Sequence, residues 1–118
     1  MRKHTLCPLL LACAIGLLAA WPYYSNPGLP AGTDAELHVF RTAELGYSLR
    51  AGALYPRWAP NFYHGYGYPI FNYYAPLTYY LSFALALGRP EAAAVGVRLA
   101  LILAQMLGAV GAYQLGRL

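Results

Sequence analysis

Three residues that could act together on a substrate recur at helical spacing in the first half of the chain. Asp34, His38 and Arg41 stand at positions i, i+4 and i+7, so on an α-helix they share one face. A carboxylate beside an imidazole can take a proton from an acceptor hydroxyl or bind a divalent cation, and a nearby arginine can hold a phosphate. The spacing therefore indicates a candidate site for proton transfer or phosphate binding.

A purely structural role explains the same residues equally well. Thr33 and Glu36 match the capping-box pattern, so Thr33 or Asp34 could simply cap a helix that begins here. Arg41 would then pair with Glu44 across one turn of that helix. From spacing alone the structural role is favoured, because carboxylates are enriched at helix N-termini.

An aromatic-rich run follows between residues 54 and 69, where rings alternate with glycines, prolines and one histidine. This run is expected to be extended. Its rings could anchor a loop among lipid headgroups, or form a stacking platform for a sugar or an isoprenoid chain. Both interpretations stay open. Under the second one, the candidate substrate-binding residues are Arg41, Arg57, Trp58, His64, Tyr66 and Tyr68.

Several classes of function are excluded by what the sequence lacks. The net charge of +4 comes from scattered arginines rather than a basic cluster, so no nucleic-acid partner is expected. The sequence contains no dinucleotide-binding glycine motif, no Walker loop, no CxxC pair and no nucleophile elbow. The only cofactor to consider is a divalent cation, for which Asp34 would be the ligand.

The elements that must position these residues are predicted to be membrane helices. Hydrophobic residues make up 59% of the chain and charged ones 10%, against about 25% charged in soluble domains. The first apolar stretch follows Arg2 and Lys3 and ends near Trp21 and Pro22, which predicts a transmembrane helix over 6–22. A cleaved signal peptide would show the same pattern. An uncleaved transmembrane helix is favoured over a signal peptide, because further apolar segments follow.

A polar segment over 23–69 separates this helix from the rest, and it is too polar for hydrocarbon. Within it, an amphipathic helix is predicted over about 34–52, lying on the bilayer surface or on neighbouring spans. The apolar positions of that helix are Leu37, Phe40, Ala43, Tyr47 and Ala51.

Two further spans are predicted over 70–87 and 92–115, joined by a tight turn over 88–91. The second of them is rich in alanine and glycine, which permits close helix packing. Positive charges lie in the N-terminal segment 1–5, and Arg89 and Arg98 lie near the turn. The N-terminal segment and the turn are therefore both expected on the cytoplasmic side. The long loop then lies outside.

The predicted fold is therefore an all-α membrane protein in which residues 1–118 form a single membrane domain. It would have about three transmembrane helices and a long outer loop that contains an interfacial helix. The expected location is the cell membrane, with lipids as partners.

A family resemblance is carried by three groups of residues. They are Thr33-Asp34 with His38, the run Leu54-Tyr55-Pro56-Arg57-Trp58-Ala59-Pro60, and Gly65-Tyr66-Gly67-Tyr68-Pro69 through Pro76-Leu77. On these residues the chain resembles the start of bacterial membrane proteins labelled 6-pyruvoyl-tetrahydropterin synthase-related, which are similar in layout to GT-C glycosyltransferases. The three-histidine zinc site that pterin chemistry would need is missing from the sequence.

The resemblance implies an enzyme that moves a sugar from a polyprenyl-phosphate carrier to an acceptor. It implies Asp34 as general base or metal-binding carboxylate, Glu36 and His38 as supporting groups, and Arg57 as a contact for lipid phosphate. Members of the family have many more spans and later loops that complete the site. The resemblance therefore implies a partial product, inactive alone, whose remaining helices are further partners. The alternative is a small structural or interaction multi-pass membrane protein without catalysis.

Overall fold

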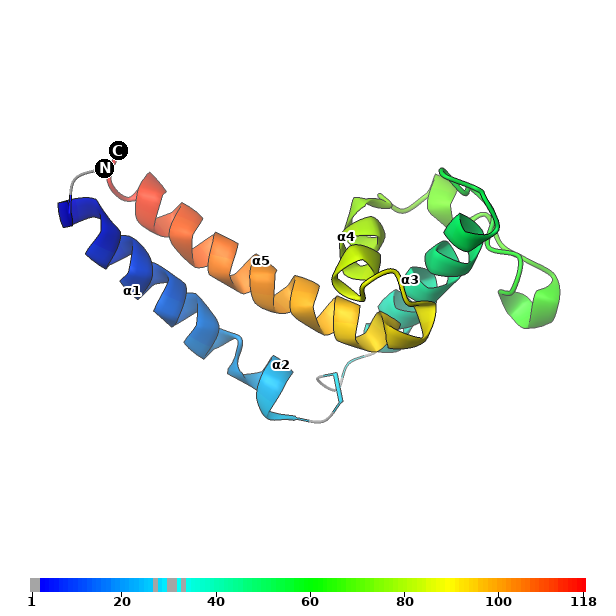
Figure 1. Ribbon diagram of the computed structural model, residues 1–118, viewed down its shortest axis with the longest axis horizontal. Coiled ribbons are helices and arrows are strands. Elements are labelled where there is room, and N and C mark those ends of the chain that lie inside the picture. Colours follow the sequence, from blue (N-terminus) through cyan, green and yellow to red (C-terminus); the bar gives the residue numbers. More distant parts are fainter. Residues whose placement is uncertain (1–2, 27, 30–31, 33) are drawn as a thin grey trace. The chain divides into compact units, whose positions relative to one another are not determined.

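The computed structural model describes residues 3–26, 28–29, 32 and 34–118, and the regular elements among these residues are helices, without any strand. An isolated β-bridge joins Ala59 to Tyr68. The all-α prediction is confirmed for this part of the chain. The elements, shown in Figure 1, are α1 (Lys3–Ala19), α2 (Trp21–Ser25), α3 (Ala35–Arg50), η1 (Tyr63–Gly65), η2 (Ile70–Asn72), α4 (Leu77–Leu85), η3 (Pro90–Ala92) and α5 (Ala93–Leu115).

The chain forms two compact units. The first comprises Met1–Pro30 and Leu101–Leu118, so it contains α1, α2 and the C-terminal part of α5. The second comprises Ala31–Ala100 and contains α3, α4 and the start of α5. We call the second one the loop unit, because it holds most of the segment that was predicted to lie outside the membrane.

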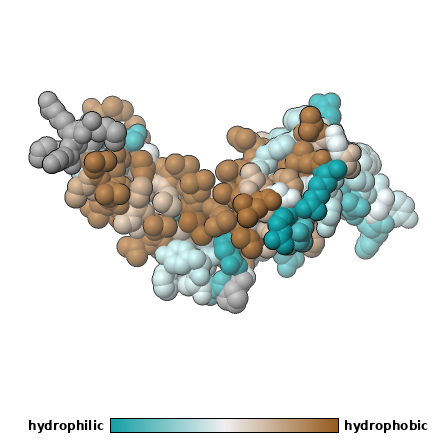
Figure 2. Space-filling view, in the orientation of Figure 1, coloured by the Kyte–Doolittle hydropathy of each residue, from teal (hydrophilic) through white to brown (hydrophobic). Residues whose placement is uncertain are grey.

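In the first unit, α1 runs antiparallel to the C-terminal part of α5 (Figure 1). A Cβ atom on Gly16 would lie 2.7 Å from Met106 Cα and 3.0 Å from the Gln105 carbonyl oxygen, so glycine lets these two helix backbones approach closely. Apolar residues cover both helices in Figure 2, and large ones such as Leu10 and Leu18 are exposed. Exposed apolar helices of this kind suit a lipid environment.

One helical stretch among the described residues, Pro90–Leu115, is long and apolar enough to cross a membrane by length and composition. The apolar part of α1, Leu6–Ala19, is shorter. The predicted helix over 6–22 ends at Ala19, because Pro22 at the start of α2 begins a new helix. A membrane protein with one candidate span is supported, and the three predicted spans are not confirmed.

The predicted second span over 70–87 requires correction. Its only α-helix is α4, whose nine residues reach about 14 Å, less than half of a typical hydrocarbon core. Pro76 is the N-cap residue of α4, at the start of the helix, where the missing N–H of proline removes no helical hydrogen bond. Residues 70–72 form the separate turn η2.

Contacts between the end of α3 and the turn over 88–91 bear on the predicted topology. Arg50 Nη2, at the end of α3, donates a hydrogen bond to the Gly88 carbonyl oxygen at 3.0 Å and lies 3.9 Å from a Glu91 carboxylate oxygen. Groups this close cannot lie on opposite sides of a bilayer. The turn over 88–91 therefore lies beside the end of α3, and the predicted cytoplasmic position of this turn is not supported.

The helix predicted over about 34–52 is present as α3, Ala35–Arg50. Thr33, the proposed capping residue, lies outside the described residues. Asp34 is the N-cap residue, yet its side chain makes no capping hydrogen bond. The structure therefore gives Asp34 no capping contact that would account for its presence.

The polarity of α3 is inverted relative to a helix on a soluble core. Its large apolar residues Leu37, Phe40 and Tyr47 are 43%, 59% and 50% exposed. Its buried residues are mostly small or polar: Arg41, Thr42, Glu44, Leu45, Gly46 and Ser48. The predicted apolar face thus points away from the core of the loop unit, which leaves it available to lipid or to other helices.

Glycines let the helices of the loop unit approach closely. A Cβ atom on Gly46 of α3 would lie 2.5 Å from the Phe83 ring of α4. A Cβ atom on Gly96 of α5 would overlap the carbonyl oxygen of Ser82 in α4. The packing brings the polar face of α3 onto α4 and onto a core formed by Leu45, Ala59, Ile70, Phe71 and Tyr79.

The aromatic run over 54–69 folds back on itself instead of being extended. The backbone N–H groups of Ala59 and Tyr68 each donate to the carbonyl oxygen of the other residue, at 2.8 and 3.0 Å. Gly67 has φ +78°, and a Cβ atom there would overlap the Trp58 indole. The run is therefore a closed loop over 59–68, held by main-chain pairing that alternating aromatics do not predict.

Candidate functional site

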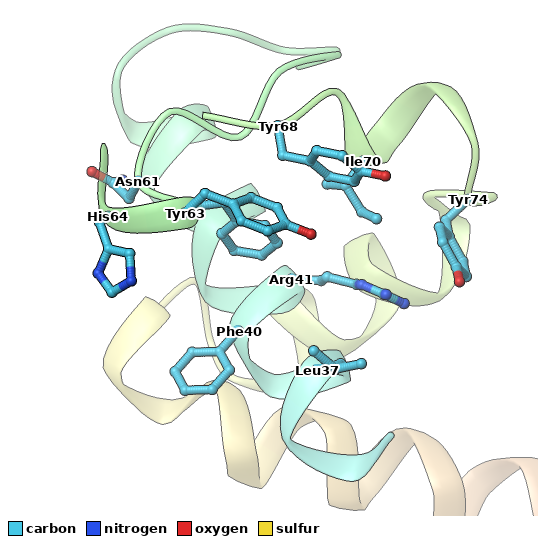
Figure 3. A pocket seen from close by; sticks show the side chains of 10 residues that line it. Leu37, Phe40, Arg41, Asn61, Tyr63, His64, Tyr68, Ile70 and Tyr74 are labelled. Atoms are coloured by element: carbon cyan, nitrogen blue, oxygen red, sulfur yellow. The ribbon is translucent and has the colours of Figure 1, made fainter. Parts of the chain in front are cut away.

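The loop unit contains a cavity of about 690 Å³ between α3 and the closed loop. We call it the Arg41 pocket. Figure 3 shows its lining side chains, with Arg41 reaching across the pocket toward Tyr74. The lining residues are Leu37, Phe40, Arg41, Asn61, Phe62, Tyr63, His64, Tyr68, Ile70 and Tyr74.

Arg41 is a buried cation held by tyrosines. The residue is 8% exposed, its Nη1 donates to the Tyr79 hydroxyl oxygen at 3.2 Å, and its guanidinium carbon lies 4.0 Å from the centroid of the Tyr74 ring. In the part of the chain that the structure describes, no carboxylate lies within ion-pair distance of it. The proposed Arg41–Glu44 pair is therefore wrong.

The charge of Arg41 is secure at any physiological pH. Burial alone lowers the pKa of its guanidinium, but hydrogen bonds with Tyr79 and Tyr74 outweigh it and raise the pKa above the ordinary value. A buried charge needs compensation, and an anion that enters the pocket can supply it through charge-assisted hydrogen bonds.

His38 joins the same network through Tyr79. The Tyr79 hydroxyl oxygen accepts from Arg41 and lies 3.3 Å from His38 Nδ1, to which the hydroxyl can donate when Nδ1 carries no proton. The two rings are 5.9 Å apart between centroids. The predicted shared face of His38 and Arg41 is thus real, and one tyrosine of α4 joins the two side chains.

The two predicted acids lie at the exposed start of α3. Asp34 and Glu36 are both exposed, and neither lines the Arg41 pocket. Asp34 precedes Arg41 by seven residues, which corresponds to about 10 Å along a helix. Among the described residues, no group of three or more His, Cys, Asp or Glu side chains could hold a metal ion. Asp34 therefore belongs to no such group in this part of the chain.

Glu44 and Asn61 form a contact that the sequence interpretation missed. Glu44 is 3% exposed, and its carboxylate accepts hydrogen bonds from the backbone N–H of Asn61 at 3.0 Å and from Asn61 Nδ2 at 3.0 and 3.3 Å. The contact fixes the closed loop on α3 beside the Arg41 pocket. No local sequence pattern could reveal this contact, since Glu44 and Asn61 are 17 positions apart. Arg41, three positions before Glu44, had instead been taken as the partner of Glu44.

A second cavity of about 540 Å³ lies on the other side of Asn61, which lines both. We call it the Trp58 pocket. Its lining includes the exposed rings of Tyr47, Tyr55 and Trp58, together with Arg57. The arrangement offers aromatic faces beside a guanidinium group, as the stacking interpretation requires.

The predicted substrate-binding residues are therefore divided between two places. His64 and Tyr68 line the Arg41 pocket with Arg41, whereas Arg57 and Trp58 line the Trp58 pocket. Tyr66 is 87% exposed and lines neither. Sequence reasoning also missed Tyr74 and Tyr79 as partners of Arg41, because both had been assigned to a membrane helix.

Comparisons with family models, curated proteins and solved structures give no match to this chain. The case for a function therefore depends on the geometry of the loop unit and on the residues that carry the resemblance.

Proposed function

We propose that the chain is the N-terminal membrane segment of a GT-C-like glycosyltransferase that uses a polyprenyl-phosphate-linked sugar donor. The observation that carries the proposal is one face of α3. Along it, the exposed carboxylate of Asp34 is followed by half-buried His38 and by buried Arg41 at an aromatic pocket. An acid and an anchored cation on one helix face are the groups that sugar transfer from a lipid phosphate needs.

In this proposal α1 and α5 cross the membrane, and α3, the closed loop and α4 lie outside it. The antiparallel arrangement of α1 and α5 supports it, as does the contact of Arg50 with Gly88, which keeps residues 50 and 88 on one side. Lys3 and Arg117 then fall on the cytoplasmic side, whereas Arg89, which the charge rule had placed there, falls outside with the long loop.

The proposed chemistry assigns separate tasks to the acid and the cation. The Asp34 carboxylate takes the proton of an acceptor hydroxyl as the acceptor oxygen forms a bond to the anomeric carbon of the sugar. The bond from that carbon to the phosphate oxygen breaks, and the lipid phosphate leaves with the electron pair. Arg41 stabilises the charge of the leaving phosphate, and His38 supports Arg41 through Tyr79.

The proposal is tested by Asp34→Asn in the protein as the cell produces it, with transfer of a labelled sugar as the readout. Loss of the base should lower the rate by about 100-fold or more. Glu91→Gln is the matched control, because Glu91 is another exposed acid of the loop unit, far from Asp34 in the sequence, and should leave transfer unchanged. Undiminished transfer by Asp34→Asn removes the catalytic role.

The rival function is a small structural or interaction membrane protein, and the exposed apolar face of α3 favours it. That face, with Leu37, Phe40 and Tyr47, would bind lipid or a partner helix. The rival function explains Asp34 as a helix cap. The side chain of Asp34 makes no capping hydrogen bond, which counts against the rival. The genomic sequence after Leu118 distinguishes the two functions. A reading frame that continues into further apolar spans supports the enzyme, and a stop codon supports the rival.

A further inference from the structure

We propose that the chain forms a dimer through α5, in which the Gln105 side chains of two copies hydrogen-bond to each other inside the membrane. The partner is a second copy of this chain. The inference goes beyond the proposed function, because no step of sugar transfer requires it. It depends on α5 as the candidate span.

The first argument is the depth of Gln105 in that span. The span covers Pro90–Leu115, 26 residues, so its midpoint falls between residues 102 and 103. At about 1.5 Å per residue, Gln105 lies about 4 Å from the midpoint, well inside a hydrocarbon core of about 30 Å. Between Leu99 and Ala112, Gln105 is the one residue with a polar side chain. An amide therefore lies near the middle of the apolar stretch.

The second argument is that this amide lies on the surface of the helix. Gln105 is exposed, and no described group forms a hydrogen bond with its side chain. In hydrocarbon, such an amide costs free energy, because its two N–H donors and its carbonyl oxygen lose the hydrogen bonds they make in water. A second helix that supplies a donor and an acceptor at the same depth removes this cost.

The third argument is the pattern of residues around Gln105. Leu101, Gln105, Gly108, Ala112 and Leu115 follow one another at spacings of four, three, four and three residues, and all five are exposed. We call them the α5 seam. Their spacing is the heptad pattern of two helices that pack at a small crossing angle. A Cβ atom on Gly108 would meet nothing within 4 Å, so a second helix can approach closely there.

The α5 seam differs from the side of α5 that contacts α1. A Cβ atom on Gly16 of α1 would lie 2.7 Å from Met106 Cα and 3.2 Å from Ala109 Cβ. Neither Met106 nor Ala109 belongs to the seam. The contact with α1 therefore leaves the seam exposed.

Membrane insertion makes a second copy the fitting partner for the seam. Every copy of the chain inserts in the same orientation, because the same positive charges orient each of them. Two copies of α5 are then parallel, and a twofold axis along the membrane normal places Gln105 opposite Gln105 of the second copy. Because the amide is both donor and acceptor, the pair can form two reciprocal hydrogen bonds. A single polar residue in such a seam also fixes the register of the two helices.

Sedimentation equilibrium of the purified full chain, in density-matched micelles of pentaoxyethylene octyl ether, measures the association. We expect a monomer–dimer equilibrium. Gln105→Leu should raise the dissociation constant about tenfold, since two hydrogen bonds are lost. Gln105→Asn keeps an amide at the same depth and should stay within about threefold of the parent chain. The matched control is Gln114→Leu, which removes the same side chain from an exposed position off the seam and should change the constant less than about twofold.

Disulfide cross-linking in native membranes tests which face of α5 meets the second copy. In a background of Cys7→Ala and Cys13→Ala, Gly108→Cys places a thiol on the seam, and Leu107→Cys places one at nearly the same depth off the seam. Mild oxidation should link Gly108→Cys into dimers and leave Leu107→Cys monomeric. Both positions are exposed, so neither substitution disturbs packing within the chain.

Three results overturn the inference. The first is a parent chain that stays monomeric at every concentration, which would assign the seam to lipid or to a different helix. The second is an equal dissociation constant for Gln105→Leu and the parent chain. The third is cross-linking of Leu107→Cys as readily as Gly108→Cys. None of these measurements involves sugar transfer, so failure of the dimer and failure of the proposed function are told apart.

Discussion

At the residue scale, the loop unit depends on polar side chains that satisfy one another inside it. The Arg41–Tyr79–His38 network and the Glu44–Asn61 contact account for the ionisable groups on the buried face of α3. Because each partner comes from a distant part of the chain, the sequence predicts that His38 and Arg41 share a face but not what they contact. Each network can be tested by a substitution of its own.

The Glu44–Asn61 contact should contribute measurably to stability. Asn61→Ala leaves the buried carboxylate without two side-chain hydrogen bonds, and the free energy of unfolding should fall by about 1–3 kcal/mol. Asn61→Asp should cost more, since it places a second carboxylate against Glu44. Denaturant unfolding measures both changes. Equal stability of Asn61→Asp and the parent chain would show that the contact does not hold the loop.

Gly67 should be the least replaceable glycine of the closed loop. Gly67→Ala forces a side chain into a positive-φ position and into the Trp58 indole, with an expected cost of about 2–4 kcal/mol. Gly65→Ala is the matched control, because Gly65 has φ +90° in the same loop but open space around it. It should cost about 1 kcal/mol. Thermal unfolding that ranks the two equally contradicts the packing of Trp58 on Gly67.

At the element scale, α3 could be predicted and α4 could not. The limits of α3 follow from local signals, namely the polar N-terminal turn and helical periodicity up to Gly52. The segment over 70–87 is apolar along most of its length. Its α-helix nevertheless starts only after Pro76 and ends at Leu85. Apolar composition is typical of both a span and a buried helix, so the sequence alone does not tell the two apart.

Close approach of α4 and α5 should depend on Gly96. Gly96→Ala places a methyl group on the Ser82 carbonyl oxygen, and we expect a loss of about 1–3 kcal/mol in the free energy of unfolding. Gly108→Ala, in open space on the same helix, should be neutral or stabilising by up to about 1 kcal/mol. Chemical denaturation in micelles measures the pair. A harmless Gly96→Ala would contradict the observed helix contact.

At the scale of the whole molecule, the central claim is that the part of the loop unit before the candidate span, residues 34–89, lies on the non-cytoplasmic side of the membrane. Composition and charge indicated a membrane protein with an outer loop, and the helices agree with one candidate span. The sequence alone did not predict that residues 50 and 88 lie together. That is a non-local contact, formed by Arg50 with Gly88 and Glu91.

Cysteine labelling in intact cells tests this claim most directly. In a background of Cys7→Ala and Cys13→Ala, single cysteines replace the exposed residues Glu36, Arg89 and Arg117. With an impermeant maleimide, we predict that Glu36→Cys and Arg89→Cys react in intact cells, and that Arg117→Cys reacts only after lysis. Labelling of Arg117→Cys in intact cells, or protection of either of the other two until the cells are broken open, would contradict the account.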